Sequence, residues 1–415
     1  MLDMEKMGGF IAKLRRQAGL TQQQVADRLR VSFQAVSKWE KGVSAPSLEL
    51  LLSLSRLLGV STDALLTGRE ETAGMSYRAA GVDIAYTDAI KSLMADSIGG
   101  DDPRVLNGLG PFASLYDLDF PELRRPLLVL KAEEPGSKQK LAVQYGYTTS
   151  ICHDLVNHLV NDIAVMGAWP LAVLDTIICG SAERDTIASL VAGIAAACRE
   201  NGCSLVGGET SIQPQVIDPG RYILCAAIAG IVPRADLIDG RAIVPGDRVL
   251  ALASNGLHTN GYTLVRAMMD QMPNLLQERV GEETFLEAVM RPHTAYYPLL
   301  KGLLPHPGVH GLAHITGGGI AGNLARILPP SVDARIDLAS LRPQAIFSCI
   351  KRNGNIADGE MLATFNCGVG LAMVASAQDA QALRARLGAR IDCYEIGVIE
   401  PGCGQVRLEG AVGWE

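Results

Sequence analysis

Residues 248–262 read Arg-Val-Leu-Ala-Leu-Ala-Ser-Asn-Gly-Leu-His-Thr-Asn-Gly-Tyr. The first six form an apolar run typical of a buried strand, and a helical pattern begins at Tyr262. The turn between them is rich in amide, imidazole, hydroxyl and glycine residues, which can approach a ligand closely and bind it without a fixed charge. A strand, a polar turn and a helix in this order predict an α/β arrangement. The turn itself is either an active-site loop or an ordinary polar turn.

Composition sets the class of protein. The chain has 415 residues, of which 48% are hydrophobic, enough for two or three domains with large cores. We find no apolar run long enough to span a bilayer and no signal peptide at the start, so we expect a cytoplasmic protein without a membrane segment. Nine cysteines, from Cys152 to Cys403, include no CxxC pair, and we expect reduced thiols.

Charge is distributed unevenly along the chain. Residues 1–70 contain ten basic and seven acidic side chains, whereas the remainder contains 27 basic and 37 acidic ones. A basic head on an acidic body indicates that the head alone meets a polyanion.

The head has the pattern of a small helical domain. Thr21 and Gln24 are spaced as a capping box, and Ser32 can cap a second helix over residues 33–41 that Gly42 ends. A third amphipathic segment follows at residues 50–58. Two helices joined by a tight turn are the geometry that places the second helix in the major groove of DNA.

Residues 11–66 resemble the Cro/repressor type of helix-turn-helix domain, above all in Gln-Ala-Val-Ser-Lys-Trp-Glu-Lys-Gly at 34–42. The resemblance implies DNA as a partner. It implies base reading by Phe33, Gln34 and Lys38, with Thr21, Gln22 and Lys41 near phosphates. The alternative is a helical protein-binding module with the same fold.

The body follows a polar linker and alternates between apolar strands and alanine-rich helices. Strands are predicted at 126–130, 203–206 and 222–232, and a helix at 186–200. A helix from Tyr262 to Met269 and then a long helical stretch are expected before Gly308. The predicted fold class is therefore multi-domain: a small all-α head and a two-domain α+β body. We place the domains at 1–68, 76–240 and 241–415, with a linker at 69–75.

One predicted helix, at residues 151–166, carries its polar side chains in a single stripe. Carboxylate and amide oxygens are ligands that Mg²⁺ accepts beside nucleotide phosphates, so the stripe predicts a metal site in a cleft. A solvated helix face is the alternative. The stripe consists of Asp154, Asn157, His158, Asn161 and Asp162.

Two glycine-rich segments suit phosphate. Thr316-Gly317-Gly318-Gly319 precedes a predicted helix at 320–328, so free backbone N–H groups would face an anion. Gly207-Gly208-Glu209-Thr210 follows a predicted strand and offers a carboxylate and a hydroxyl at its end.

Taken in order, several segments resemble the phosphoribosylformylglycinamidine cyclo-ligase family, over residues 76–400. They are residues 76–84, 161–162 with 167–171, 202–210, 254–262, 313–319 and 361–370. The resemblance implies a homodimer that uses ATP and Mg²⁺ to close the imidazole ring of aminoimidazole ribonucleotide from formylglycinamidine ribonucleotide.

With the chemistry of the side chains, the resemblance also implies roles for particular residues. The expected catalytic residues are His258, Asn255 and Asp162, and the expected metal ligands are Asp162 and Glu133. The expected nucleotide-binding residues are Glu133, Gly136, Ser137, Lys138, Asp154, Asp162, Glu209 and Thr210. The expected substrate-binding residues are Asn255, His258, Thr259, Asn260, Thr316, Gly317, Gly318 and Gly319.

The chain departs from the family on the side that faces the nucleotide. Glu133-Glu134-Pro135-Gly136-Ser137-Lys138 stands where the family has Asp-Gly-Val-Gly-Thr-Lys, and Arg78-Ala79 replaces a lysine and an acid. The glycine-rich flap is thinned at residues 107–112. A working cyclo-ligase with a DNA-binding head is therefore weighed against a transcription factor whose body senses a purine intermediate. A sibling selenophosphate, thiamine-phosphate kinase or hydrogenase-maturation enzyme is the third reading.

Overall fold

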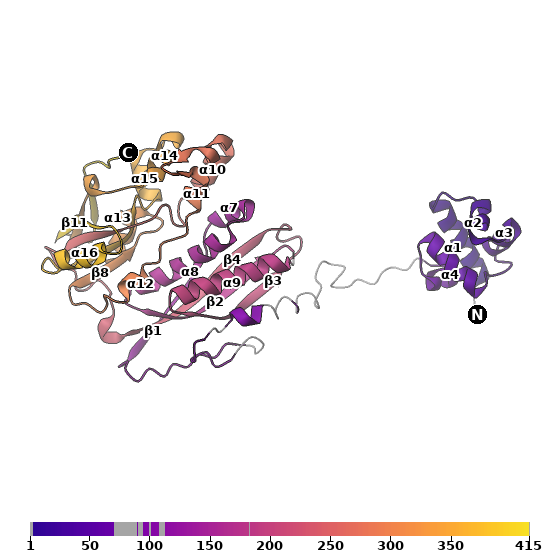
Figure 1. Ribbon diagram of the computed structural model, residues 1–415, viewed down its shortest axis with the longest axis horizontal. Coiled ribbons are helices and arrows are strands. Elements are labelled where there is room, and N and C mark those ends of the chain that lie inside the picture. Colours follow the sequence, from indigo (N-terminus) through magenta and orange to yellow (C-terminus); the bar gives the residue numbers. More distant parts are fainter. Residues whose placement is uncertain are drawn as a thin grey trace. The chain divides into compact units, whose positions relative to one another are not determined.

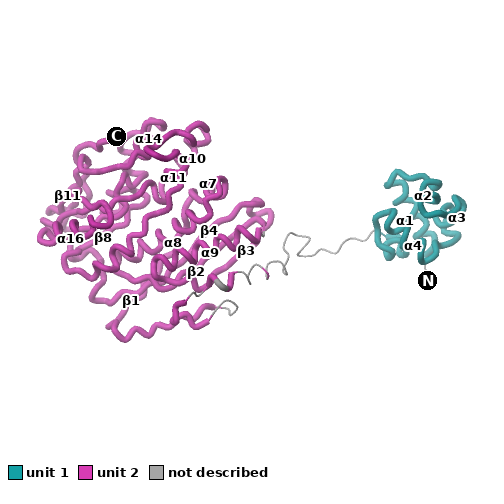
Figure 2. The backbone as a smooth tube through the Cα atoms, viewed as in Figure 1, with its two compact units in different colours: residues 1–79 teal, residues 80–415 magenta. Residues whose placement is uncertain are grey.

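The computed structural model describes residues 3–69, 89, 94–98, 101–107, 113–181 and 183–414 (Figure 1). The chain forms two compact units, residues 1–79 and 80–415 (Figure 2). Residues 76–84, which carry part of the family resemblance, and 108–112 of the flap lie outside the described residues. No helix in the described ranges is both long enough and apolar enough to cross a membrane.

The smaller unit is a bundle of short helices around one core. Its helices are α1 (Met4–Gln17), α2 (Gln22–Leu29), α3 (Phe33–Glu40), α4 (Leu48–Leu58) and α5 (Thr62–Thr67). The predicted capping box at Thr21 and Gln24 is present, and Ser32 caps α3. The helix predicted to reach residue 41 ends at Glu40, with Lys41 as its C-cap. Helix α1 was not predicted from the sequence; its Met7 and Ile11 belong to the same core as Trp39.

The larger unit contains two sheets, and the first has the strand order β1-β4-β2-β3. Its strands are β1 (Pro126–Glu133), β2 (Trp169–Cys179), β3 (Ser204–Ile212) and β4 (Tyr222–Pro233). Helices α7 (Lys138–Tyr145), α8 (Thr148–Ala164) and α9 (Arg184–Glu200) accompany this sheet, with α8 and α9 packed over one of its faces (Figure 1). A short 3-10 turn, η1 (Ala95–Ser97), precedes these elements.

A buried carboxyl lies under the helices of this sheet. Asp175 of β2 pairs with Ala226 of β4 and Gly208 of β3, and its side chain is 4% exposed. Its Oδ2 has no hydrogen-bond partner among the described residues. Burial raises the pKa of Asp175 to about 7. Burial raises the pKa of Cys152 on α8 to about 12, and the carboxyls of Asp154 and Asp175 act in the same direction.

The second sheet has the order β12-β9-β11-β5-β10-β8. Its strands are β5 (Arg248–Ala253), β8 (Val309–His314), β9 (Val332–Asp337), β10 (Val369–Ala375), β11 (Cys393–Pro401) and β12 (Val406–Glu409). The strand predicted at 248–253 is therefore confirmed as β5. It lies inside the sheet between β11 and β10, which fits its unbroken apolar sequence.

Short helices surround the second sheet. They are α10 (Tyr262–Gln271), α11 (Phe285–Met290), α12 (Tyr297–Leu300), α13 (Gly319–Leu324), α14 (Ala345–Gly354), α15 (Asp358–Thr364) and α16 (Ala380–Gly388). Short 3-10 turns also occur: η2 (Arg234–Asp236), η3 (Pro273–Gln277), η4 (Ala325–Ile327) and η5 (Leu338–Ser340). The long helical stretch predicted before Gly308 is wrong. A hairpin of β6 (Arg279–Val280) and β7 (Glu283–Thr284) interrupts it, and residues 291–296 belong to no helix or strand.

Candidate functional site

The polar stripe of α8 is buried apart from Asp162, and it binds segment 291–296, which belongs to no helix or strand. Nδ2 of Asn157 donates to the carbonyl of His293 at 2.7 Å. Asn161 donates to the carbonyl of Thr294 at 2.8 Å and accepts from the N–H of Tyr296 at 2.8 Å. Buried backbone groups need hydrogen-bond partners. The side-chain amides of Asn157 and Asn161 supply these hydrogen bonds to segment 291–296, as a neighbouring strand would in a sheet. The expectation that the whole stripe faces a cleft or water is therefore wrong.

Asp154 and Lys138 bind each other inside the protein. Nζ of Lys138 lies 2.8 Å from Asp154 Oδ2, and both side chains are fully buried. The ammonium also donates to the carbonyls of His258 and Arg291, and Asp154 accepts the N–H of His293. Burial raises the pKa of Asp154 to about 6 and lowers that of Lys138. These two predicted nucleotide ligands instead join the first half of the body to the second, and neither is free to contact a nucleotide.

Four histidines meet beside this pair. His258 follows β5 in a left-handed conformation, His314 ends β8, His293 lies in segment 291–296, and His158 belongs to α8. Nε2 of His293 lies 2.9 Å from Nε2 of His314, and the rings of His258 and His293 stack with centroids 3.9 Å apart. All four are buried, and Thr259 Oγ1 lies 3.1 Å from His158 Nδ1.

Three of these imidazoles, those of His258, His293 and His158, are kept neutral. Burial lowers the pKa of His258 and of His293 well below the usual value, and the neighbouring imidazoles act in the same direction. Burial together with His314 lowers the pKa of His158 to about 4. A neutral imidazole can accept a proton or bind a metal at neutral pH, and these rings are suited to both tasks.

Two carboxylates at the rim of the histidine cluster share a cation. Nζ of Lys131 lies 3.0 Å from both Glu133 Oε2 and Asp162 Oδ2. Asp162 Oδ1 also lies 2.7 Å from Nδ1 of His314. Burial works against ionisation of Asp162, but the hydrogen bond with His314 and the surrounding cations hold its pKa well below the usual range. The two predicted metal ligands are therefore brought together, and both are placed to contact one positive charge.

The remaining predicted substrate residues line the neighbouring loops. Nδ2 of Asn255 donates to the carbonyl of Pro292 at 2.8 Å. Asn323 of α13 donates to the carbonyls of residues 316, 317 and 319 and so holds the glycine-rich loop, in which Gly317 and Gly318 are exposed. A Cβ on Gly317 would lie 3.4 Å from Oδ1 of Asn260, which places that side chain beside the loop.

The segment 133–138 contacts the polar turn that follows β5. A Cβ on Gly136 would lie 3.3 Å from the carbonyl oxygen of Thr259, so backbone and backbone come close there. The predicted residues Glu209 and Thr210 lie elsewhere. They are on β3, at the opposite edge of the sheet from β1, and Glu209 is exposed. Within this chain the structure does not bring them to the histidine cluster.

Sequence reasoning missed Lys131 and His293, and it gave His158 and His314 no role in catalysis. His314 had a signal, since it directly precedes the glycine-rich loop at the end of a strand. His158 lay within the recognised polar stripe. No periodic pattern marks His293, because its segment is neither helix nor strand and is held by side chains distant in sequence, chiefly those of α8.

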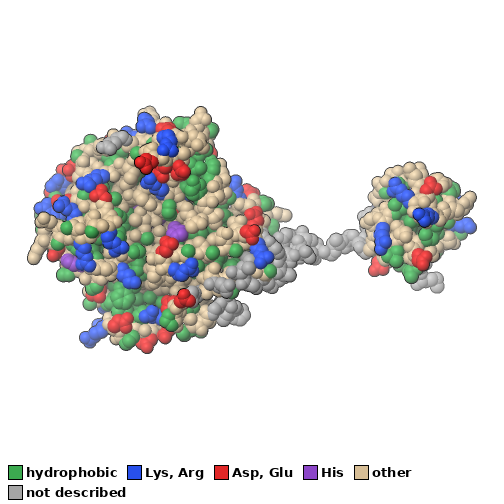
Figure 3. All heavy atoms as spheres, in the orientation of Figure 1, with side chains coloured by type: hydrophobic (Ala, Val, Ile, Leu, Met, Phe, Trp, Pro, Cys, Tyr) green, Lys and Arg blue, Asp and Glu red, His purple; other side chains and the backbone are tan. Residues whose placement is uncertain are grey.

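In the smaller unit the predicted base-reading side chains lie on one exposed surface of α3. Phe33 is 43% exposed, and Gln34 and Lys38 are also exposed. Gln22 is held differently, because its amide donates to Glu40 at 2.7 Å, and Glu40 is also paired with Arg15 at 2.6 Å. On the face of the larger unit drawn in Figure 3, basic and acidic side chains are interspersed among the described residues, with no single broad basic area.

The arrangement of the larger unit is shared with solved structures. HypE of E. coli has a TM-score of 0.58 at 19% identity, and the match covers 79% of this chain and 97% of that one. Thiamine-monophosphate kinase of Stenotrophomonas maltophilia has a TM-score of 0.56 at 20% identity, covering 80% of this chain and 98% of that one. The body therefore has the mixed α/β fold of these proteins, and the helical head precedes it.

Sequence comparison identifies the family within that fold. The models for the N-terminal and C-terminal domains of AIR synthase related protein match residues 128–232 and 244–408, and a helix-turn-helix model matches 11–65. The phosphoribosylformylglycinamidine cyclo-ligase of Methylobacillus flagellatus is 42% identical over 344 residues, 82% of this chain and 97% of that protein. The one from Chromobacterium violaceum is 41% identical over 332 residues, 79% and 96%. The chain belongs to the phosphoribosylformylglycinamidine cyclo-ligase family and carries an N-terminal helix-turn-helix domain.

Proposed function

We propose that the body catalyses the ATP-dependent cyclisation of formylglycinamidine ribonucleotide to aminoimidazole ribonucleotide, and that the head binds DNA. The names of the relatives support the reaction. One observation supports the same reaction for this chain. Glu133 and Asp162, which both contact the ammonium of Lys131, lie beside imidazoles that burial keeps neutral. Metal-assisted phosphoryl transfer followed by proton transfer needs both kinds of group side by side.

Glu133 and Asp162 are the residues that would hold Mg²⁺ with ATP. The donor set fits this ion, since Mg²⁺ is bound through one or two carboxylates and the phosphates of a nucleotide. Lys131, 3.0 Å from each carboxylate, would move aside or turn to the phosphates when the ion enters. The ion would neutralise charge on the triphosphate. Exposed backbone N–H groups of Gly317 and Gly318 would bind a phosphate of the substrate.

The proposed reaction has two steps. The formyl-amide oxygen of the substrate attacks the γ-phosphorus of ATP, and ADP leaves. An internal nitrogen then bonds to the activated carbon, and phosphate leaves with the former formyl oxygen. The nitrogen must lose a proton, and Nδ1 of His258 is a suitable acceptor because it is neutral and has no hydrogen-bond partner among the described residues. Asn255 and Asn260 would orient the reacting amide, while Thr259 positions two of the imidazoles.

The direct test is conversion of formylglycinamidine ribonucleotide by the purified full chain, with ADP release and imidazole formation both measured. We expect activity that needs Mg²⁺ and falls by at least about 100-fold in His258→Ala and Asp162→Asn. His153→Ala removes a half-buried histidine outside the cluster, bonded to the exposed Glu200, and serves as the matched control. Nucleotide binding without ADP release in the unchanged protein would overturn the proposal.

A second function is a nucleotide or purine-intermediate sensor without turnover. One observation favours it: an ammonium, that of Lys131, already lies between the two carboxylates that would bind Mg²⁺. The variant Lys131→Ala distinguishes a working enzyme from a sensor. An enzyme in which Lys131 binds phosphate loses activity, whereas a body silenced by this contact gains Mg²⁺ affinity and begins to release ADP.

For the head, we propose that α3 enters the major groove with Phe33, Gln34 and Lys38 toward the bases, and with Gln22 near the backbone. Their shared exposed surface supports this. A gel-shift series on genomic fragments tests it. Gln34→Ala and Lys38→Ala should weaken specific binding by about 1–3 kcal/mol each, while Gln23→Ala on α2 serves as control. If both α3 variants bind DNA as well as the unchanged protein, α3 does not read the bases, and the head is instead a protein-binding module.

We also propose that the body is a homodimer through the open face of its first sheet. Leu128 and Leu130 of β1 are 57% and 68% exposed, and Leu174 of β2 and Ile223 of β4 add to the same open face. A sheet face this apolar is typical of an interface.

A further inference from the structure

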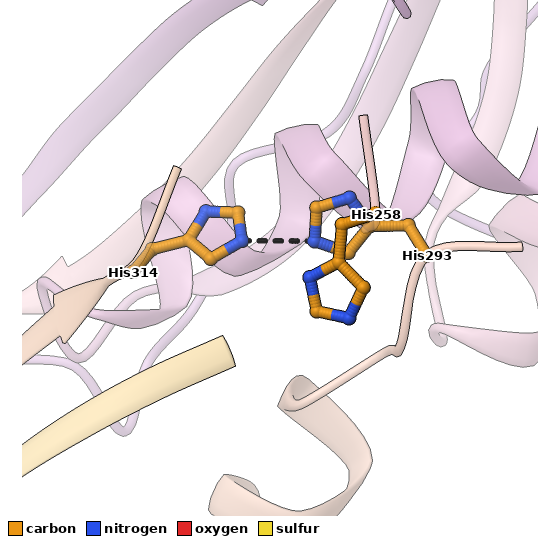
Figure 4. A group of neighbouring side chains, drawn as sticks. All are labelled: His258, His293 and His314. Carbon is orange, nitrogen blue, oxygen red and sulfur yellow. Dashed lines mark hydrogen bonds between the residues drawn. The ribbon is translucent and has the colours of Figure 1, made fainter. Parts of the chain in front are cut away.

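Three of the buried histidines form a cluster with the composition of a metal centre. His258, His293 and His314 each offer a ring nitrogen, and these nitrogens lie within 4.8 Å of one another. Figure 4 shows the rings coming from three separate segments, with His293 bonded to His314 and the ring of His258 stacked beside that of His293. The rings are 1%, 1% and 6% exposed as residues, so bulk water does not compete for these positions.

Hydrogen bonds account for five of the six ring nitrogens. His293 and His314 are bonded through both of their nitrogens, and His258 through Nε2. The sixth, Nδ1 of His258, has no partner among the described residues although it is buried. A buried nitrogen without a partner costs free energy, so its persistence next to two other imidazoles points to a ligand.

The outer nitrogen of each ring is held as in metal-bound histidines. Nδ1 of His314 lies 2.7 Å from Asp162 Oδ1, Nε2 of His258 lies 3.3 Å from Thr294 Oγ1, and Nδ1 of His293 lies 3.5 Å from Thr259 Oγ1. A histidine that binds a metal almost always gives its other N–H to an oxygen, and a carboxylate, histidine and metal in series is the commonest form. Here all three outer nitrogens have an oxygen partner.

We propose that Nδ1 of His258, Nε2 of His293 and Nε2 of His314 bind one divalent transition metal ion of the Zn²⁺ type, with its fourth position open. Three imidazoles suit Zn²⁺, Ni²⁺ or Cu²⁺, whereas Mg²⁺ requires oxygen ligands, so this site differs from the one at Glu133 and Asp162. Binding replaces the hydrogen bond between His293 and His314. It also turns the His258 ring, because two stacked rings do not aim their lone pairs at one point.

A second set of ligands lies next to the first. His158, Asp162 and His314 also offer atoms within 4.8 Å of one another. In that set the carboxylate is already 3.0 Å from the ammonium of Lys131, and Nδ1 of His158 is bonded to Thr259. The three-histidine set holds the unpartnered nitrogen and no cation, and this is the reason for choosing it.

The test uses the full chain, stripped with a chelator, and Co²⁺ as the probe in excess Mg²⁺, without ATP or substrate. We expect the visible absorption of four-coordinate Co²⁺ to saturate at about one equivalent and to disappear when Zn²⁺ is added. His258→Ala and His293→Asn should abolish the band, and Asp162→Asn should weaken Co²⁺ binding by roughly 10–100-fold because it orients His314. His153→Ala is the control, and circular dichroism confirms that each variant is folded.

Two results would overturn the proposal. One is a chain with native circular dichroism that develops no band with Co²⁺. The other is a band that survives in His258→Ala and His293→Asn but is lost in His158→Ala, which would assign the metal to the second set. A metal ion on Nδ1 of His258 and the proton transfer proposed for that atom exclude each other, so the metal-bound chain would not catalyse the cyclisation. The Co²⁺ test measures binding without turnover, so its outcome is read separately from that of the activity assay.

Discussion

Buried ionisable side chains in this protein are displaced in both directions from their ordinary pKa values. Most of them have partners: Asp162 has His314 and Lys131, and Asp154 has Lys138. Asp175 lacks a partner for Oδ2, and its pKa is raised to about 7 by burial. A buried carboxyl without a hydrogen-bond or cationic partner destabilises the folded state when it ionises.

Asp175→Asn should therefore stabilise the body at high pH alone. The folded state holds this proton between about pH 4 and pH 7 and the unfolded chain does not, so the carboxyl lowers stability as pH rises through that range. The gain should be near zero at pH 4 and up to about 4 kcal/mol at pH 8. Urea unfolding of the body at both pH values measures it, with the exposed Asp270→Asn as control. An equal change at pH 4 and pH 8 would contradict the assignment.

At the scale of elements, α8 holds the two halves of the body together. Asn157, Asn161 and Asp154 bind the backbone of segment 291–296 across more than 130 residues of chain. The sequence predicted this helix and its polar stripe correctly, because a period of 3.6 residues is a local property. It could not predict the partner, since nothing local in residues 291–296 marks them as the backbone that the stripe would bind.

The same difference between local and distant information explains which of the other sequence predictions were confirmed and which were wrong. The capping box at Thr21 and the apolar strand β5 depend on adjacent residues and were predicted. The helical stretch expected before Gly308 was wrong because Pro273 and Pro292 lack the N–H that a continuous helix needs. The histidine cluster gathers residues from four separate segments, and only the folded chain shows that His293 belongs to it.

Asn161→Ala tests the role of α8. It leaves the carbonyl of Thr294 and the N–H of Tyr296 buried without partners, so we expect a loss of about 3 kcal/mol in the stability of the body. Urea unfolding measures this, with Asn274→Ala, an exposed asparagine in η3, as control. Equal unfolding midpoints for the two variants would show that segment 291–296 is held by other contacts.

At the scale of the molecule, the proposed dimer through the exposed apolar face of the first sheet would determine how many heads act together. A dimer of the body would carry two helix-turn-helix units, which is how such proteins bind two half-sites of one operator. Leu130 is the most exposed large apolar side chain in this sheet, at 68%.

Leu130→Arg should separate the proposed dimer, because it would bury a charge without a partner in the interface. Light scattering is expected to give half the mass of the unchanged protein. Leu48→Arg, which alters a leucine of the head that is 79% exposed, is expected to leave the mass unchanged. If the unchanged protein is a monomer, there is no such interface. If Leu130→Arg is still a dimer, the interface lies elsewhere.

Segment 291–296 also predicts how fast particular backbone amides exchange their protons with solvent. Its amide protons at His293 and Tyr296 belong to no helix or strand, yet both are buried and bonded to side chains of α8. They can exchange with solvent only when the two halves of the body part. Hydrogen exchange at these two positions should therefore be as slow as in the central strands β5 and β10, and its rate reports directly how often the histidine cluster opens to water.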